Sequence, residues 1–140
     1  MPADHDAVSC RPVGRVRSDL VDLDHAPRQG DEGAPGAWLD FADEVAEGLA
    51  GLRPGDRVVL LTWLHRARRD VLAVHPRSDP SRPLQGVFGT RSPDRPNPIG
   101  LHEVEILAID GRSLRVGGLE AVDGTPLLDV KPVLGPAAER

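Results

Sequence analysis

The sequence predicts a mainly β fold with one short helix, from three observations. Short runs of apolar or alternating residues recur along the chain, separated by clusters of Pro, Gly, Asp and Ser. Only one segment has helical periodicity, and an Asp-Gly pair between two of the runs is a hairpin signal. Many short strands favour a closed or nearly closed β-barrel, which removes unpaired edges, although the pattern alone leaves a β-sandwich open.

The first half of the chain supplies the helix and the central strand. Residues 13–17 alternate and predict a half-buried strand, and residues 19–36 form an irregular connection long enough to be functional. Asp40 is placed to cap a helix running to about residue 50, with Phe41, Val45 and Leu49 on one face. Pro54-Gly55 predicts a type II turn, and the apolar run 58–64 predicts the central strand.

The second half of the chain predicts five more short strands. The Asp110-Gly111 pair should join two of them as an antiparallel hairpin. The five segments are residues 71–74, 86–88, 101–109, 114–119 and 127–133.

Length and composition predict one domain without a disulfide. A chain of 140 residues buries roughly two thirds of its unfolded surface in one core. We expect residues 11–134 to form the domain, with a disordered tail at 1–10 and a further tail at 135–140. Cys10 is the single cysteine, the start lacks a signal-peptide pattern, and no apolar run is long enough to span a membrane, which together predict a cytoplasmic protein.

Charge is unevenly distributed along the chain. The formal net charge is −5, but residues 53–95 hold nine arginines against four aspartates. This basic segment either meets a phosphate or carboxylate or is a solvated face; its candidates are Arg66, Arg68, Arg69, Arg77, Arg82, Arg91 and Arg95. Aromatic residues are scarce, and packing rather than base stacking is expected for Trp38, Phe41, Trp63 and Phe88.

The sequence lacks the patterns that are typical of several kinds of functional site. The five histidines show no metal-ligand spacing, and a single cysteine excludes a multi-cysteine zinc or iron–sulfur site, so no metal is expected. The serine elbow of a Ser-His-Asp hydrolase and the glycine-rich turns of nucleotide-binding folds are also absent. A nucleoside cofactor would therefore have to be held by irregular loops.

The most distinctive segment is the loop of residues 87–100. It contains three prolines, two arginines and an asparagine behind a short apolar run. Each proline fixes its own φ and restricts the preceding residue, so the loop is stiff before any ligand arrives. The polar groups of a stiff loop can bind a ligand with little loss of conformational entropy, which makes the loop a candidate site. The alternative is a proline-rich surface turn.

This loop resembles the signature of the TsaA-like (TrmO/YaeB-type) family, a Thr-Arg-Ser-Pro-x-Arg-Pro-Asn-Pro-Ile-Gly string that matches residues 90–100. Four further family motifs match in order: PVGRVRS at 12–18, PRQG at 27–30, LHR at 64–66 and DGTPLLDVKP at 123–132. Five ordered motifs over nearly the whole chain are more specific than any one. The resemblance implies a small β-barrel that binds S-adenosylmethionine, acts as a homodimer and methylates the exocyclic amine of threonylcarbamoyl-adenosine in tRNA.

Position by position, the resemblance also implies which residues contact the cofactor. They are Pro27, Arg28, Gln29, His65, Arg66, Arg91, Leu101, Asp123, Gly124, Thr125 and Pro126. The alternatives are surface ion pairs for Arg28 and Arg91, a simple turn at Asp123-Gly124 and a core position for Leu101.

Methyl transfer from a sulfonium needs an acceptor held near the methyl carbon and protected from water. Our candidates for orienting the acceptor and removing its proton are Arg95 and Asn97 in the loop, with Asp129 and Lys131 in the final strand. Asn97 has the alternative role of capping its turn through the side-chain amide.

The acceptor has two candidate classes. The motif match favours tRNA. The net charge, the scarcity of aromatic residues, Val133 in place of a frequent family tyrosine and an expected lack of the family's C-terminal domain favour a small metabolite. A third hypothesis is a module that binds the cofactor without catalysing a reaction.

Overall fold

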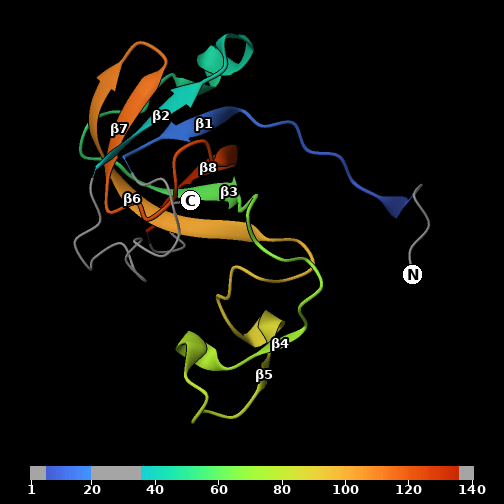
Figure 1. Ribbon diagram of the computed structural model, residues 1–140. Coiled ribbons are helices and arrows are strands. Elements are labelled where there is room, and N and C mark those ends of the chain that lie inside the picture. The colour runs from blue at the N-terminus through green and yellow to red at the C-terminus, as the bar shows by residue number, and fades with distance from the viewer. Residues whose placement is uncertain (1–5, 20–35, 136–140) are drawn as a thin grey trace.

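The computed structural model describes residues 6–19 and 36–135, and its main body is a closed six-stranded β-barrel (Figure 1). Around the barrel the strands follow the order β1-β2-β7-β6-β3-β8, and every pair is antiparallel. Their bounds are β1 Gly14–Arg17, β2 Ala37–Phe41, β3 Arg57–Trp63, β6 Ile99–Asp110, β7 Ser113–Gly117 and β8 Pro126–Pro132. The barrel prediction is confirmed.

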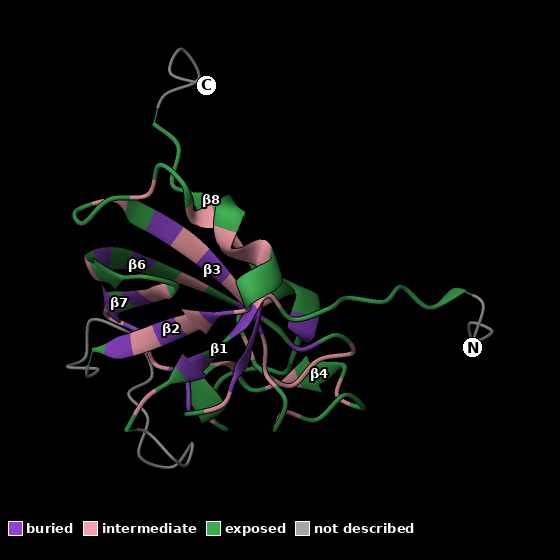
Figure 2. Cartoon of the chain, turned by 90° about the horizontal axis from the view of Figure 1, so that it is seen from above, coloured by how far each residue is buried: buried purple, intermediate pink, exposed green. Residues whose placement is uncertain are grey.

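Strand alternation builds the core. Each barrel strand sends alternate side chains inward, and Figure 2 shows buried and exposed residues alternating along the strands. The interior is almost entirely aliphatic, as the composition predicts, with Phe41 as its aromatic member. Pairing of Gly14 with Leu127 joins β1 to β8 and closes the ring, so the described barrel has no open side.

The predicted helix begins later than expected, and the strand before it was missed. Asp40 lies in β2 rather than at a helix N-terminus, where two short bonds from Arg17 (2.8 and 2.9 Å) hold the pKa of its carboxyl below the ordinary value. The helix is the 3-10 helix η3, Asp43–Leu49, and no side chain caps its start. Val45 and Leu49 still pack against the core, as their spacing indicated.

Both predicted turns are confirmed. The Asp56 amide donates to the Arg53 carbonyl at 3.1 Å, and Gly55 has a φ of 96°, which a type II turn requires at this position. Gly111 has a φ of 59° in the tight turn that joins β6 to β7. Glycine tolerates both left-handed conformations without strain.

Between β3 and β6 the chain leaves the barrel and forms a small arm (Figure 1). The arm contains two paired two-residue strands, β4 Ala73–Val74 and β5 Gln85–Gly86. The 3-10 helix η4, Pro76–Ser78, lies between them, and the 3-10 helix η5, Val87–Gly89, follows β5. The strand predicted at 71–74 is therefore shorter than expected, and the one predicted at 86–88 is wrong beyond Gly86, because Val87 and Phe88 lie in η5. Phe88 is 82% exposed, so the prediction that it packs in apolar surroundings is wrong.

One polar pair lies inside the barrel. His102 of β6 faces inward at 2.9 Å from the buried hydroxyl of Thr62 on β3. Burial lowers the pKa of His102 to about 4, because the charged imidazolium loses hydration there.

This shift predicts a pH-dependent stability. The folded pKa of about 4 lies below the ordinary 6.5, so the unfolded chain binds more protons between these values. The free energy of unfolding therefore has its full value above pH 6.5 and decreases as the pH falls towards 4. The decrease due to His102 is on the order of 2 kcal/mol. Urea unfolding of the wild type and of His102→Asn at several pH values measures it. A wild-type slope in this window no steeper than that of the variant would contradict the assignment.

Within the described ranges, no helix is both long and apolar enough to cross a bilayer. Those same residues contain no cluster of His, Cys, Asp and Glu suited to a metal ion.

Candidate functional site

A pocket of about 150 Å³ lies where three of the sequence motifs meet. The turn after β3 contributes His65 and Arg66, the proline-rich loop contributes Pro93 and Asp94, and the segment before β8 contributes Thr125. Its remaining lining is Leu64, Ala67, Glu120, Ala121 and Val122. Sites for drug-sized ligands commonly measure 300–1,000 Å³, so the pocket by itself is smaller than a ligand as large as a nucleoside would need.

The pocket combines charged and apolar surfaces. Arg66 and His65 lie near Asp94 and Glu120 in the lining, so both signs of charge are available. Leu64, Ala121 and Val122 supply apolar walls. A ligand with a zwitterionic part and a flat apolar part matches this combination.

The turn of residues 123–126 is fixed to β1. The Gly124 amide donates to the Val16 carbonyl at 2.8 Å, and Asp123 Oδ1 accepts from the Ser18 amide at 3.0 Å. The buried Thr125 hydroxyl donates to the Val122 carbonyl at 2.7 Å. Gly124 has a φ of 84°, so the predicted alternative of a turn is observed, and this rigid turn also borders the pocket. Pro126 begins β8.

Arg95 has a role in the loop itself. Its Nε donates to the Ser92 carbonyl at 2.8 Å, and one terminal nitrogen donates to the carbonyls of Val87 (2.6 Å) and Thr90 (2.5 Å). These bonds hold the loop together from within. The geometry supports a structural function for Arg95 more directly than contact with an acceptor.

Asn97 is exposed and in contact with another arginine. Its Oδ1 accepts from Arg69 at 3.0 Å, and its backbone carbonyl accepts from the Ile99 amide at 2.7 Å. The side chain therefore binds Arg69 rather than capping the turn.

Leu101, Asp129 and Lys131 lie on the outer face of the barrel. Leu101 is 49% exposed, so its alternative as a core residue is wrong. Leu61 of β3 pairs with Leu101 on one side and with Asp129 on the other, and Lys131 pairs with Val59. Lys131 and Asp129 form an exposed ion pair at 3.4 Å. None of these side chains lines the pocket.

Several arginines of the basic segment are engaged by neighbouring groups, two of them by carboxylates. Arg68 pairs with Asp70 at 3.0 Å and Arg82 with Asp79 at 3.8 Å, while Arg69 and Arg95 donate to oxygens of the loop. Arg91 is exposed and makes no hydrogen bond or ion pair within the described part of the chain, so the predicted alternative of an ion pair is not observed there. Pro27, Arg28 and Gln29 lie outside the described residues.

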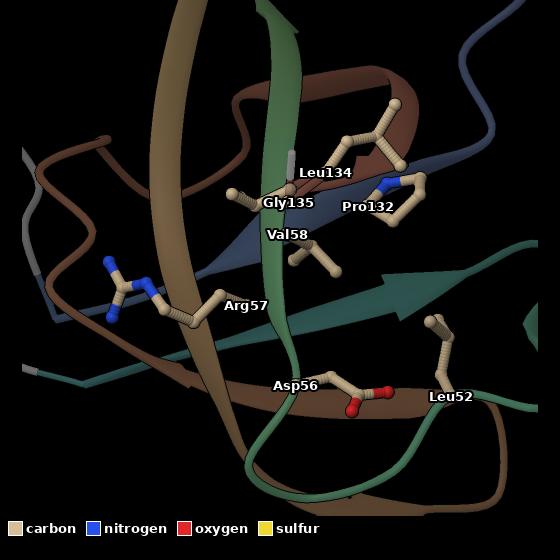
Figure 3. A pocket seen from close by; sticks show the side chains of 8 residues that line it. Leu52, Asp56, Arg57, Val58, Pro132, Leu134 and Gly135 are labelled. Carbon is tan, nitrogen blue, oxygen red and sulfur yellow. The ribbon is translucent and has the colours of Figure 1, made fainter. Parts of the chain in front are cut away.

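A second hollow, of about 450 Å³, lies between the start of β3 and the residues after β8 (Figure 3). Its apolar side chains include Val58, Pro132 and Leu134, and the side chain of Arg57 points away from them. The Asp56 carboxylate accepts from the Arg53 amide at 3.0 Å, and Arg57 pairs with Glu103 at 2.9 Å. Because these polar groups are engaged and no predicted residue lies there, the smaller pocket is the better candidate site.

Sequence reasoning missed several of these residues. Glu120, Ala121 and Val122 belong to none of the five motifs, so nothing in the sequence marked them. Asp94 occupies the variable position of the loop signature, yet its Oδ1 accepts from the Arg68 amide at 2.8 Å and ties the loop to the turn after β3.

The fold is a small closed β-barrel, and the candidate site is a pocket formed by loops. The family model of the tRNA-methyltransferase O N-terminal domain matches residues 15–137, and the chain belongs to this family. The family predicted from the motifs is thereby confirmed.

Similar proteins extend this result. A probable S-adenosyl-L-methionine-binding protein of Methanothermobacter thermautotrophicus is 43% identical over 125 residues, 89% of each chain. One of Archaeoglobus fulgidus is 44% identical over 125 residues, covering 89% of this chain and 34% of that protein. A crystal structure of TrmO from Pseudomonas aeruginosa has a TM-score of 0.73 and 31% identity, covering 94% of this chain and 58% of that one. The chain thus spans about a third of the length of the A. fulgidus relative and under two thirds of the length of the TrmO chain.

Proposed function

We propose that this protein is an S-adenosylmethionine-dependent N-methyltransferase. The observation that carries the proposal is the convergence of three family motifs on one pocket that has both signs of charge and apolar walls. S-adenosylmethionine carries an ammonium group, a carboxylate and a flat adenine, which suit such a lining. Relatives named as S-adenosyl-L-methionine-binding proteins support the cofactor.

The residues proposed to hold the cofactor are those around the pocket, together with Arg91, which the family resemblance implies as a contact and which lies outside the pocket lining. Arg66 would bind the carboxylate, Asp94 or Glu120 the ammonium group, and Val122 and Leu64 the adenine. When bound, the sulfonium supplies an electrophilic methyl group. The chain's own contribution is positional: the loop stiffened by Arg95 and the turn pinned to β1 hold their groups in place and limit water near the acceptor.

We propose the threonylcarbamoyl-adenosine of a tRNA anticodon loop as the acceptor. Membership of the tRNA-methyltransferase O family and the structural likeness to TrmO support it. The ion pairs of Arg68 with Asp70 and of Arg82 with Asp79 favour the second candidate, a small metabolite, because they offset positive charge that RNA phosphates would use. The M. thermautotrophicus relative, which is matched over 89% of its length, is named for S-adenosyl-L-methionine binding alone, and this keeps a binding module as the third candidate.

We also propose that the active form is a homodimer. Leu101, Asp129 and Lys131 face outward and do not line the pocket, although the family resemblance implies Leu101 as a cofactor contact. A second copy that applied its outer face to this pocket would unite the two groups and enlarge the site. Sedimentation at micromolar concentration measures this, and a monomeric mass with and without cofactor would contradict it.

Two experiments test the proposed function in turn. Calorimetry with S-adenosylmethionine and with S-adenosylhomocysteine tests the cofactor, and binding of neither at sub-millimolar concentration would contradict methyl transfer. Mass spectrometry of tRNA nucleosides from a deletion strain tests the acceptor. Unchanged methylated threonylcarbamoyl-adenosine would exclude the tRNA hypothesis and leave the small-molecule one.

A further inference from the structure

Arg69 links the proline-rich loop to the end of β3. Its Nε donates to the Pro96 carbonyl at 2.7 Å, and a terminal nitrogen donates to Asn97 Oδ1 at 3.0 Å. Its Cζ lies 5.1 Å from the centroid of the Trp63 ring, within the range of a cation–π contact. The stacking and the two charge-assisted bonds together fix the plane of the guanidinium.

The support beneath this contact is rigid. Trp63 is the last residue of β3 and pairs in register with Ile99, two residues after Asn97. The Leu64 amide donates to the Pro98 carbonyl at 2.8 Å. The segment that carries Asn97 is therefore tied to the end of β3 by backbone pairing and by Arg69, so its side chain is ordered before a ligand binds.

This arrangement decides which way the Asn97 carboxamide faces. A guanidinium only donates hydrogen bonds, so the amide oxygen must face Arg69 and the Nδ2 group must face away. Asn97 is exposed, and Arg69 is the one hydrogen-bond partner of its side chain within the described part of the chain. The two N–H donors are thus available to a ligand.

We propose that Arg69 is a positioning residue that orients Asn97, so that the Asn97 amide donates to a carbonyl or carboxylate oxygen of the methyl acceptor. The inference rests on the proposed methyltransferase function and adds a recognition chemistry to it. A threonylcarbamoyl group carries both a carbonyl and a carboxylate, whereas unmodified adenosine carries neither. Asn97 then selects the acceptor by donation and takes no proton from it.

Three substitutions separate the parts of this inference. Asn97→Asp keeps an oxygen for Arg69 and removes the donors. Arg69→Met keeps an apolar side chain over Trp63 and removes the bonds to Asn97 and Pro96. Arg68→Met is the matched control, because the Arg68 side chain pairs with Asp70 at 3.0 Å and both side chains are about 70% exposed.

The binding test uses two anticodon stem–loop RNAs that differ only in threonylcarbamoyl-adenosine against adenosine. Asn97→Asp and Arg69→Met should each reduce the wild-type preference for the modified RNA by about ten-fold, and Arg68→Met should keep it. Asn97→Asp should melt at the wild-type temperature. Adding Arg69→Met to Asn97→Ala should cause little further loss, since both act through one group. A preference retained in Asn97→Asp, or losses that multiply in the double variant, would overturn the inference.

A second readout is independent of catalysis and of RNA. In ¹⁵N-labelled protein, Arg69→Met should shift the two side-chain amide proton resonances of Asn97, and Arg68→Met should leave them in place. Unchanged resonances in Arg69→Met would overturn the positioning role by itself. Absence of any preference in the wild-type protein would instead overturn the tRNA function together with the proposed recognition by Asn97, while the resonances still report on Arg69.

Discussion

Replacing Arg95 with methionine is expected to lower the free energy of unfolding by about 3–5 kcal/mol and to weaken cofactor binding. The guanidinium donates to the Ser92, Val87 and Thr90 carbonyls at 2.8, 2.6 and 2.5 Å. Each bond from a charged donor contributes about 1.5–3 kcal/mol, and water replaces part of what a methionine removes. Calorimetric melting measures the first effect, and titration with S-adenosylhomocysteine measures the second.

Arg82→Met is the matched control for Arg95→Met. Arg82 lies in the same arm and pairs with Asp79 at 3.8 Å, with about half of each side chain exposed. An exposed pair of this kind contributes less than about 1 kcal/mol, so the control should melt close to the wild type. Equal melting temperatures for the two variants would show that Arg95 does not hold the loop together.

Replacing Arg91 with alanine is expected to weaken S-adenosylmethionine binding about ten- to a hundred-fold without changing stability. The family resemblance assigns Arg91 to the cofactor, and its side chain is exposed and makes no hydrogen bond or ion pair within the described part of the chain. Loss of one charge-assisted hydrogen bond costs about 1.5–3 kcal/mol, which corresponds to that change in affinity. Isothermal titration and thermal melting together separate the two properties.

Arg53→Ala controls for the loss of one positive charge. Arg53 belongs to the type II turn before β3 and is also exposed. Its removal should leave cofactor affinity unchanged. Wild-type affinity in Arg91→Ala, or an equal loss in both variants, would contradict a specific contact by Arg91.

Local patterns predicted most of the barrel, because alternation and turn chemistry are encoded by adjacent residues. The strands at β1, β3, β6, β7 and β8 and both glycine turns follow this rule. Strand β2 was missed because its last residues, Asp40 and Phe41, also fit the start of a helix. As a strand, β2 pairs with β1 on one edge and with β7 on the other and buries Leu39 and Phe41. These contacts join residues that are far apart in the sequence, so they cannot be recognised locally.

Long-range contacts also explain why the structure of the candidate site differs from the one expected from the sequence. The stiffness of the proline-rich loop follows from its sequence, but the partners of its side chains do not. Arg69 reaches Asn97 across 28 positions, and the Arg68 amide reaches Asp94 across 26. Composition could not show that Phe88 is exposed on the arm or that Leu101 faces outward.

The most direct test of methyl transfer uses purified protein, S-adenosylmethionine labelled in the methyl group, and a stem–loop RNA that carries threonylcarbamoyl-adenosine. Nuclease digestion followed by mass spectrometry locates the label. We predict one labelled methyl group on the exocyclic nitrogen of the modified adenosine and none on the unmodified control RNA. Cofactor binding with no label in either RNA would contradict the tRNA methyltransferase assignment.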